Sequence, residues 1–330
     1  MSDNPFDPNY VAPEPKAPEA DKGPMLTVKG AYPDISNEDY HRNPLLLPEP
    51  SLSSSGVKTL LTKSPRHYWW DSVMNPNRAP ESDKPHLVVG KAIHDALLLP
   101  ERWNNDEHFH TVPDGFVAAH SVKWADYIPS YRKAVRMGKS IIPESDVAKV
   151  NRMAAEVAKD ELATALLMSG TPEMTLVWQD HLTGVWCRAR PDVLPDLRAI
   201  VPDVKSSIDG SPEAFEKSAD KFRYLHSAAF YLDGLNAVFG EEERRFVFIV
   251  IEKSEPFTVT IYQADEGDIE LARMENRRAI NLFAECLKRG TDIEAWPDYG
   301  RGKVLPLTMA PWTRNRINKE AELGLLSYHN

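Results

Sequence analysis

The sequence predicts an α/β fold of the α+β type, in which a central mixed β-sheet is flanked by helices and preceded by a helical N-terminal lead-in. Helical patterns dominate residues 53–168, short β-rich runs fill residues 174–207, and residues 211–290 combine helices with two more strands. An order of helices, strands, helices, strands and a final helix is typical of a sheet covered by helices. With 330 residues, the chain can bury one large core or two smaller ones.

The two ends of the chain are expected to lie outside this core. Residues 1–32 form a proline-rich acidic tail that is expected to be disordered, because its composition buries too little apolar surface to offset chain ordering. Order is expected to begin between Tyr32 and Leu52. The folded domain is therefore expected to span residues 33–300, followed by a basic C-terminal extension over residues 301–330.

The lead-in contains several helical regions. The serines at 53–55 favour a helix N-terminus, and this helix is expected to stop before Pro65. A second helix fits residues 86–103, with Pro100 ending it. Residues 121–168 are mostly helical and are locally basic, with Lys123, Arg132, Lys133, Arg136, Lys139 and Lys149.

The strands are expected in short runs rich in β-branched and aromatic residues and bounded by turn residues: 174–178, 184–194, 199–207, 244–253 and 257–264. Between and after them, helices are expected from Ser211, over residues 223–239 and over residues 268–288. The last two are expected to end at Gly240 and Gly290, where glycine favours a helix terminus.

The composition is that of an ordinary globular protein, with 42% hydrophobic and 27% charged residues. Neither a membrane span nor a secretory signal is expected, because no apolar run is long enough and the N-terminus lacks a basic segment followed by an apolar one. Two cysteines, Cys187 and Cys286, favour a reducing, cytoplasmic location over a disulfide framework. The net charge of −10 argues mildly against a surface that binds nucleic acid everywhere, but it permits a local basic channel.

Acidic residues cluster around three of the predicted strands. Glu173 precedes the first, Asp192 ends the second, and Asp203 and Lys205 lie on the third. Residues two apart on a strand point to the same face, so Asp203 and Lys205 are expected to project together. The second and third strands are expected to be neighbours that each present an acid from their ends, so that Asp192 and Asp203 can bind one cation.

Phosphodiester cleavage requires such a group. Carboxylate oxygens suit Mg²⁺, for which Mn²⁺ can substitute, and the ion can neutralise the scissile phosphate and acidify a water. We therefore expect Asp192 and Asp203 to be metal ligands and Lys205 to stabilise developing charge. An Asp-x-Lys at a strand end is usually a solvated ion pair, but here the apolar run before Asp203 indicates that the acid emerges from a buried strand.

Four tracts resemble the PD-(D/E)XK nuclease superfamily, in the branch of exonuclease VIII (RecE-type) proteins. The central tract, residues 170–207, follows that family's pattern of an acid before a strand, then Cys-(Lys/Arg)-x-Arg-Pro-Asp, then a strand with Asp-x-Lys. GKAIHDALLLPE at 90–101 and the segment 50–70 resemble its upstream helices, and residues 221–240 resemble its later helix. The resemblance covers roughly residues 35–290.

The resemblance implies roles for further residues. His94 corresponds to a metal-binding histidine, although a lone histidine on an apolar helix is more often a core residue, and Glu173 would assist in holding metal or water. Arg188 and Arg190 could bind backbone phosphates or simply pair with acids. Where that family has Gln-x-x-x-Tyr, this chain has Ser227 in place of the glutamine and keeps the tyrosine as Tyr231. The role of the glutamine near DNA is therefore either lost or passed to His226, the residue before Ser227.

The resemblance also implies a substrate and partners. It implies a magnesium-dependent exodeoxyribonuclease that digests double-stranded DNA ends from 5′ to 3′ and leaves single-stranded tails for an annealing protein or recombinase, in a phage or prophage recombination setting. It further implies a ring-like homo-oligomer, and no membrane partner.

Two alternative hypotheses assign the chain to other functional classes of protein. One is a non-catalytic DNA-binding or assembly protein on a decayed nuclease fold, which Ser227 slightly favours and the intact Asp192, Asp203 and Lys205 oppose. The other is a different metallohydrolase, for which the expected paired-histidine motifs are missing from the sequence. An iron–sulfur nuclease is excluded because it needs four cysteines.

Overall fold

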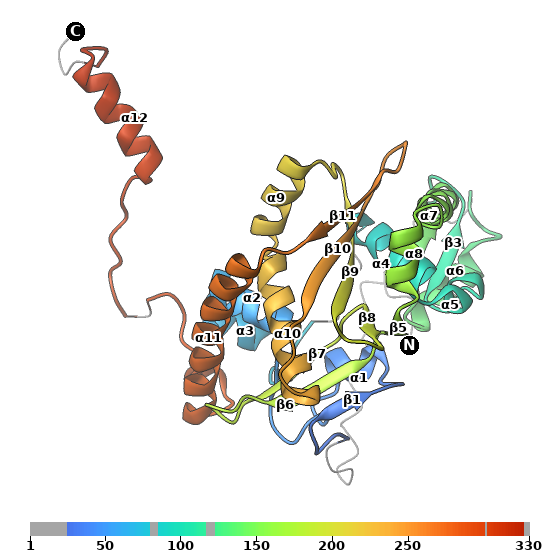
Figure 1. The fold of residues 1–330 in the computed structure, drawn as a ribbon, viewed down its shortest axis with the longest axis horizontal. Coiled ribbons are helices and arrows are strands. Elements are labelled where there is room, and N and C mark those ends of the chain that lie inside the picture. Colours follow the sequence, from blue (N-terminus) through green and yellow to red (C-terminus); the bar gives the residue numbers. More distant parts are fainter. Residues whose placement is uncertain (1–24, 80–84, 117–122, 301, 327–330) are drawn as a thin grey trace.

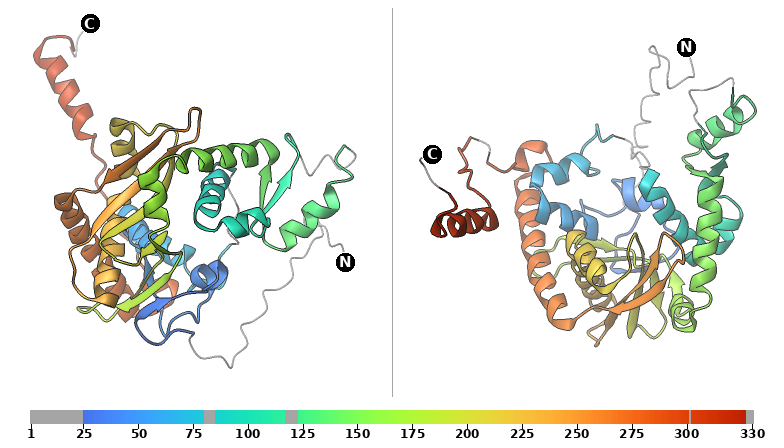
Figure 2. Two further views of the ribbon diagram at one scale, coloured as in Figure 1. Left: turned by 45° about the vertical axis from the view of Figure 1, so that its right-hand side comes forward. Right: turned by 90° about the horizontal axis from the view of Figure 1, so that it is seen from above.

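The protein consists of a central three-stranded sheet between two groups of helices, with a second sheet at one end (Figures 1 and 2). One group of helices comes from residues 54–71, 224–239 and 266–289, and the other from residues 85–167. This arrangement confirms the predicted fold class. The computed structural model describes residues 25–79, 85–116, 123–300 and 302–326.

The central sheet has the strand order β11-β10-β9. Strands β9 (Ile200–Ser207) and β10 (Arg245–Glu252) are parallel, and β11 (Val259–Gln263) is antiparallel to β10. Nearly every residue of β10 is buried, as expected for a strand that is covered by helices on both faces. All three strands lie where the sequence predicted them.

The second sheet has the order β1-β6-β7-β2. Strands β6 (Thr175–Gln179) and β7 (Trp186–Ala189) are antiparallel, β1 (Gly30–Tyr32) pairs with β6, and β2 (Leu52–Ser53) runs parallel to β7. Thus the short strands that precede the first long helices complete a sheet whose centre lies more than a hundred residues later in the chain.

The predicted strand over residues 184–194 is wrong as a single element. The chain leaves the second sheet after β7 and enters β8 (Val193–Pro195), which pairs with β5 (Gly170–Pro172) in a separate two-stranded sheet. Pro191 has no amide hydrogen and a fixed φ, so it cannot continue a ladder. The break places Asp192 in the bend between β7 and β8.

One group of helices contains α2 (Ser54–Thr62), α3 (Pro65–Asp71), α10 (Tyr224–Phe239) and α11 (Glu266–Arg289). The predicted caps are confirmed. The Ser53 hydroxyl accepts a hydrogen bond from the amide of Gly56, and α10 ends at Gly240, whose φ of 101° lies in the left-handed region. Helix α11 ends at Gly290 as predicted and begins slightly earlier, at the N-cap Asp265.

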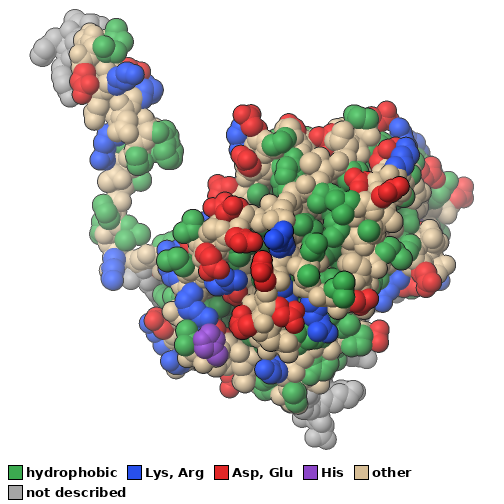
Figure 3. Space-filling view, in the orientation of Figure 1, with side chains coloured by type: hydrophobic (Ala, Val, Ile, Leu, Met, Phe, Trp, Pro, Cys, Tyr) green, Lys and Arg blue, Asp and Glu red, His purple; other side chains and the backbone are tan. Residues whose placement is uncertain are grey.

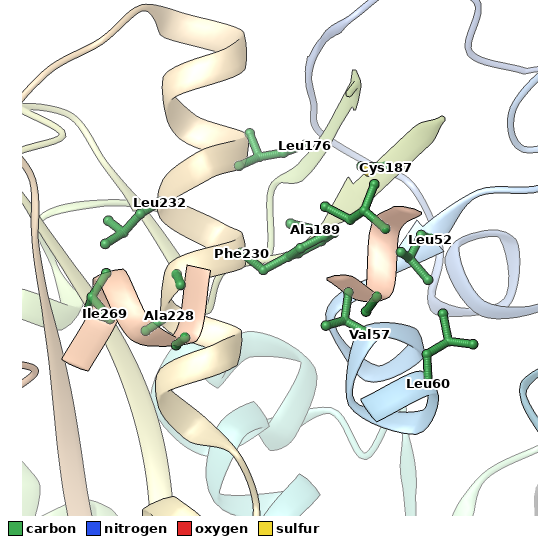
Figure 4. Close-up of a cluster of buried hydrophobic side chains, with 14 of the residues drawn as sticks. Leu52, Val57, Leu60, Leu176, Cys187, Ala189, Ala228, Phe230, Leu232 and Ile269 are labelled. Carbon is green, nitrogen blue, oxygen red and sulfur yellow. The ribbon is translucent and has the colours of Figure 1, made fainter. Parts of the chain in front are cut away.

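The larger apolar core lies between this group of helices and the two sheets. Figure 4 shows how side chains of α2, β6, β7, α10 and α11 meet there, among them Val57, Leu176, Phe230 and Ile269. Each is almost fully removed from water. Burying a side chain of this size stabilises the fold by about 1.5–3 kcal/mol, so this cluster dominates the stability of the domain.

Residues 85–167, which we call the helical lobe, form the other group. Its elements are α4 (Pro85–Leu98), α5 (Pro100–Asn104), β3 (Phe109–Val112), α6 (Ile128–Arg136), β4 (Ser140–Pro143), α7 (Glu144–Val157) and α8 (Glu161–Leu167). Its apolar residues, including Ile93, Ile142 and Met153, pack against Val204 and Ile249 of the central sheet. The lobe is therefore fixed to the sheet by its own core.

Two details of the lobe differ from the sequence-based expectation. The helix predicted over residues 86–103 is broken at Leu99, because Pro100 begins a new helix and cannot continue the previous one. Residues 121–168 are mostly helical as predicted, but β4 interrupts them and pairs in parallel with β3. Residues 117–122 lie outside the described residues.

The folded domain begins earlier than predicted. Leu26 is buried against the second sheet and β1 starts at Gly30, so the expected boundary at residue 33 is too late. The signal was missed because the tail's composition does not show that β6 offers a pairing edge. Helix α1 (Asn37–Arg42) follows β1. Residues 1–24, most of the predicted tail, lie outside the described residues.

Besides α1, helices α9 and α12 lie outside the two groups. Helix α9 (Pro212–Lys221) follows β9 and begins at the predicted proline. Helix α12 (Pro311–Glu322) ends a C-terminal arm, residues 302–326, that stands away from the domain and exposes hydrophobic side chains (Figures 1 and 3). No helix within the described ranges has the length and apolar character needed to cross a membrane.

A buried ion pair ties the end of β6 to α11 and leads to a prediction about pH. Arg277 donates two hydrogen bonds to Asp180, at 2.6 and 2.8 Å, and Thr183 donates two more. Burial alone would raise the pKa of Asp180, but these donors outweigh it and lower the pKa to about 2. Because the folded-state pKa lies below the unfolded value, the stabilisation is present above the unfolded pKa and is lost as pH falls toward 2.

We therefore expect Asp180→Asn to be destabilised relative to wild type near neutral pH, and the difference to shrink by about 2 kcal/mol as pH falls from about 5 to about 2. Urea unfolding of both proteins at a series of pH values measures it. The difference between the two proteins isolates Asp180 from the other titrating acids. A difference that stays constant over this range would show that the ion pair does not perturb the carboxyl as described.

Candidate active site

Strand β9 carries the predicted Asp-x-Lys pair. Asp203 and Lys205 lie on the same face and form an ion pair, while Val204 between them points to the opposite face and joins the core of the helical lobe. Asp203 is only 5% exposed, so its carboxylate emerges inside the protein, as predicted from the apolar run before it.

The electrostatics of the pair follow from burial and from a second carboxylate. Burial raises the pKa of Asp203, and Asp192 nearby raises it further, while Lys205 opposes both. Burial lowers the pKa of Lys205, but Asp203 and Asp192 outweigh it and leave the pKa raised. Lys205 is therefore held as a cation, and an ionised Asp203 depends on positive charge beside it.

Asp192 reaches β9 from the bend between β7 and β8. Its Oδ2 accepts a hydrogen bond of 2.6 Å from the amide of Val204. The prediction placed Asp192 and Asp203 on adjacent strands, whereas β7 and β9 belong to different sheets. The two acids nevertheless meet, because β9 is an edge strand whose free amide is bonded by the Asp192 side chain.

His94 comes to the same place on α4. Its Nδ1 lies 3.6 Å from Oδ2 of Asp192, and its side chain is partly exposed. Helix α4 passes close to β9 here: a β-carbon at Gly90, one turn before His94, would lie 3.5 Å from Oγ of Ser206. The structure thus brings His94, Asp192, Asp203 and Lys205 together from α4, a bend and β9.

Glu173 lies next to Asp192 through the backbone. Its amide donates a hydrogen bond of 3.0 Å to the Asp192 carbonyl, and its φ of 49° places it in the left-handed region. A non-glycine residue in this region is uncommon and is found where tertiary contacts over-determine the backbone. Its carboxylate helps to raise the pKa of His108 and opposes the lowering of the pKa of Arg190 by burial.

Of the three predicted residues on helix α10, one lies near the site and two have other neighbours. Tyr231 lies close enough to Asp203 and Asp192 that both help burial to raise its pKa. His226 instead shares its Nε2 with Glu275 of α11, at 2.6 Å, and with Arg223. The buried Ser227, which replaces the family's glutamine, sits beside it. Among these residues, the structure brings only Tyr231 to the carboxylates.

Arg188 and Arg190 make hydrogen bonds within the protein. Arg188 donates to the carbonyl and hydroxyl oxygens of Ser51, and Arg190 donates to Thr175, Asn37 and the carbonyl of Ile35. Both guanidinium groups also lie near the ring of Tyr40. Neither forms an ion pair with an acid among the described residues, and these bonds join β6 and β7 to the N-terminal segments. A DNA-binding role for them stays a prediction.

The donor chemistry of the site fits Mg²⁺ or Mn²⁺. Oδ2 of Asp203 is buried, and apart from its ion pair with Lys205 it has no hydrogen-bond donor within the described residues. In the same part of the chain no three His, Cys, Asp or Glu side chains are arranged as a complete ligand set. Mg²⁺ commonly binds through one or two carboxylates together with waters and substrate phosphates, so Asp192 and Asp203 are sufficient donors.

Sequence reasoning missed two residues at the site. Lys58 of α2 lies within electrostatic range of Lys205 and Asp203. Burial lowers the pKa of Lys58, the charge of Lys205 lowers it further, and the charge of Asp203 opposes both effects. Tyr224 at the start of α10 has its ring 5.3 Å from Nζ of Lys205. Lys58 lies in the serine-capped tract that resembles the nuclease family's opening segment, and only that tract could have indicated it.

The family comparison agrees with this geometry. The model of DUF3799, described as a PDDEXK-like domain of unknown function, matches residues 53–303. The chain belongs to this family. The DUF3799 match begins at the N-cap of α2 and contains every candidate site residue, and Pro191-Asp192 with Asp203-Val204-Lys205 fits the order of the PDDEXK motif.

Solved structures agree with the fold. The crystal structure of a "putative exonuclease" from Eubacterium rectale superposes with a TM-score of 0.52 at 15% identity, covering 86% of this chain and 98% of that one. At this identity the likeness shows a shared fold. The crystal structure of SSO0001, at a TM-score of 0.27 and 13% identity over 59% of this chain and 87% of that one, is too distant to carry an argument. No curated protein sequence matches the chain.

Membership of a PDDEXK-like family confirms the predicted superfamily. The narrower resemblance to the exonuclease VIII branch stays a prediction.

Proposed function

We propose that the protein is a metal-dependent exodeoxyribonuclease that hydrolyses phosphodiester bonds from the ends of double-stranded DNA. The observation that carries the proposal is the Asp203–Lys205 ion pair on β9 beside the Asp192 carboxylate, in the residue order of the PDDEXK motif. This group combines anionic oxygen ligands for a divalent cation with a protonated amine at one edge of a sheet. Such a combination suits phosphodiester hydrolysis.

Each residue would have a defined part. Bound Mg²⁺ supplies positive charge that neutralises the scissile phosphate and acidifies an attacking water. Asp192 and Asp203 would hold the ion together with waters, His94 beside Asp192 is the proposed further ligand, and Glu173 would assist from beside Asp192. Lys205, which the two carboxylates keep protonated, would stabilise the negative charge that develops on the phosphate oxygens.

The finer features of the proposal rest on the resemblance to exonuclease VIII-type proteins. They are 5′-to-3′ polarity, a ring-like homo-oligomer around DNA, and delivery of single-stranded tails to an annealing protein or recombinase in the cytoplasm. A DNA contact by Tyr231 is proposed on the same resemblance, and its hydroxyl lies within electrostatic range of Asp203 and Asp192. The internal hydrogen bonds of Arg188, Arg190 and His226 make these three weaker candidates.

The deciding experiment compares linear and covalently closed circular duplex DNA, each incubated with Mg²⁺, Mn²⁺ or EDTA. We expect the linear DNA to be degraded with either metal, and the circle to persist under every condition. A label placed on one 5′ end or one 3′ end then gives the polarity.

Cutting of the circle would indicate an endonuclease and contradict the requirement for an end. If neither DNA is cut with any metal while both are still bound, the chain is a DNA-binding protein on a nuclease fold.

A further inference from the structure

A basic segment of the helical lobe lies outside the candidate active site. Residues 123–139 contain Lys123, Arg132, Lys133, Arg136 and Lys139 but a single acid, Asp126. The whole chain, by contrast, has 49 acidic and 39 basic residues and a net charge of −10. Positive charge is therefore concentrated in this segment against the overall balance of the protein.

Helix α6 in this segment has an apolar face and a basic face. Ile128 and Ala134 are buried, and Tyr131 between them is half-buried, so residues three apart form the stripe that packs on β3 and β4. Arg132, Lys133 and Arg136 lie off this stripe and are exposed. The fold thus buries one side of α6 and presents these cations to solvent on the other.

These three cations have no ion-pair or hydrogen-bond partner for their side chains in the part of the chain that the structure describes. Elsewhere arginines are commonly paired with carboxylates: Arg66, Arg102, Arg152, Arg223, Arg244, Arg245, Arg273, Arg277, Arg278 and Arg316 all are. Unpaired cations on a rigid helix repel one another, and the residues that the structure describes place no carboxylate beside these three to offset that cost. A polyanion bound from outside would offset this repulsion.

The basic helix is joined firmly to the candidate active site. The amide of Ser140 in β4 donates to the carbonyl of His108, and the side chain of His108 bonds that of Asp95 at 2.6 Å. Asp95 directly follows His94 on α4, and the lobe shares its core with the central sheet. The lobe surface that carries α6 is therefore held in a fixed position relative to Asp203 and Lys205.

We infer that the exposed face of α6, formed by Arg132, Lys133 and Arg136, is a second DNA-binding surface that contacts the phosphate backbone of the duplex away from the cleavage site. The inference rests on the proposed function for the choice of DNA over an acidic protein as the polyanion. Contacts of this kind give affinity and register without sequence preference, which suits an enzyme that must act on any end.

The test measures binding alone. Fluorescence anisotropy of a labelled blunt duplex of about 40 base pairs, in EDTA so that nothing is cut, gives Kd as a function of salt. Each phosphate contact contributes about 0.9 to the slope of log K against log[salt]. The triple variant Arg132→Gln, Lys133→Gln, Arg136→Gln should lower the magnitude of the slope by about 2 to 3 and weaken binding at least about tenfold near 0.1 M salt.

A matched control removes the same charge elsewhere. Arg314→Gln, Arg316→Gln and Lys319→Gln on α12 of the C-terminal arm should leave the slope close to wild type. The double variant Arg132→Lys, Arg136→Lys, which keeps the charges, should also keep the slope. A thermal unfolding midpoint for the α6 variant equal to that of wild type shows that its fold is intact.

An unchanged slope for the α6 variant would overturn the inference, and so would an equal loss in the α12 control, because net charge would then explain both. Failure of this inference can be distinguished from failure of the proposed function. A protein that binds through α6 but cuts nothing would contradict only the nuclease activity. A protein that cuts linear DNA and keeps its slope in the α6 variant would contradict only the second surface.

Discussion

Lys205→Ala should lower the rate of metal-dependent cleavage of linear duplex DNA by at least about 10²- to 10³-fold, the usual cost of removing one preorganised donor to developing charge. The ammonium of Lys205 is held beside Asp203 and kept protonated by two carboxylates. The measurement is single-turnover cleavage of end-labelled duplex at saturating protein, so that weaker DNA binding does not enter the rate.

Lys217→Ala is the matched control, since this lysine is exposed on α9 and lies outside the site. Its cleavage rate should stay within about twofold of wild type, as expected for a surface substitution. A Lys205→Ala protein that folds, binds DNA and still cleaves at near the wild-type rate would remove Lys205 from the proposed mechanism.

Trp296→Ala should have the largest effect on stability, a loss of about 3–5 kcal/mol in the free energy of unfolding. Trp296 is fully buried, with its ring stacked on Tyr68 of α3 and edge-on to Phe283 of α11. Its indole nitrogen donates a hydrogen bond to the carbonyl of Gly290. The side chain therefore joins the segment after α11 to the N-terminal helices, and its removal leaves a cavity that surrounding groups fill only in part.

Urea unfolding followed by fluorescence or circular dichroism measures the loss. Trp312→Ala on the C-terminal arm is the control, because Trp312 is 76% exposed and should cost less than about 0.5 kcal/mol. Equal stability of the Trp296 and Trp312 variants would show that the segment after α11 does not belong to the cooperative core.

Elements with strong local signals could be predicted from the sequence. The amphipathic repeat that becomes α11 is bounded by Gly290, the apolar run that becomes β10 is bounded by charged residues, and Pro212 marks the start of α9. In each case neighbouring residues supply both the periodicity and the boundary, so no information from distant parts of the chain is needed. The Asp203–Lys205 pair belongs here too, because side chains two apart on any strand share a face.

Features that depend on pairing between distant segments could not be predicted in the same way. β1 forms only because β6 offers it an edge, and the predicted strand at 184–194 is divided between two sheets at Pro191. Arg190 is bonded to Asn37 and Ile35, which no local pattern connects to it. The influence of Lys205 and Asp203 on Lys58 likewise depends on how α2 packs against α10 and α11.

The fold class and the succession of helices and strands could be predicted from the sequence. So could the chemical types at the site: two acids and a lysine in the order of the PDDEXK motif, with a histidine upstream of them. Two features of the site became clear from the three-dimensional arrangement alone. Asp192 joins Asp203 through a hydrogen bond to the edge of β9 rather than from an adjacent strand, and α4 brings His94 to 3.6 Å from Asp192. The reason is physical. Periodicity is encoded within a few residues, whereas the meeting of side chains about a hundred residues apart is decided by core packing and by edge amides that must find hydrogen-bond partners.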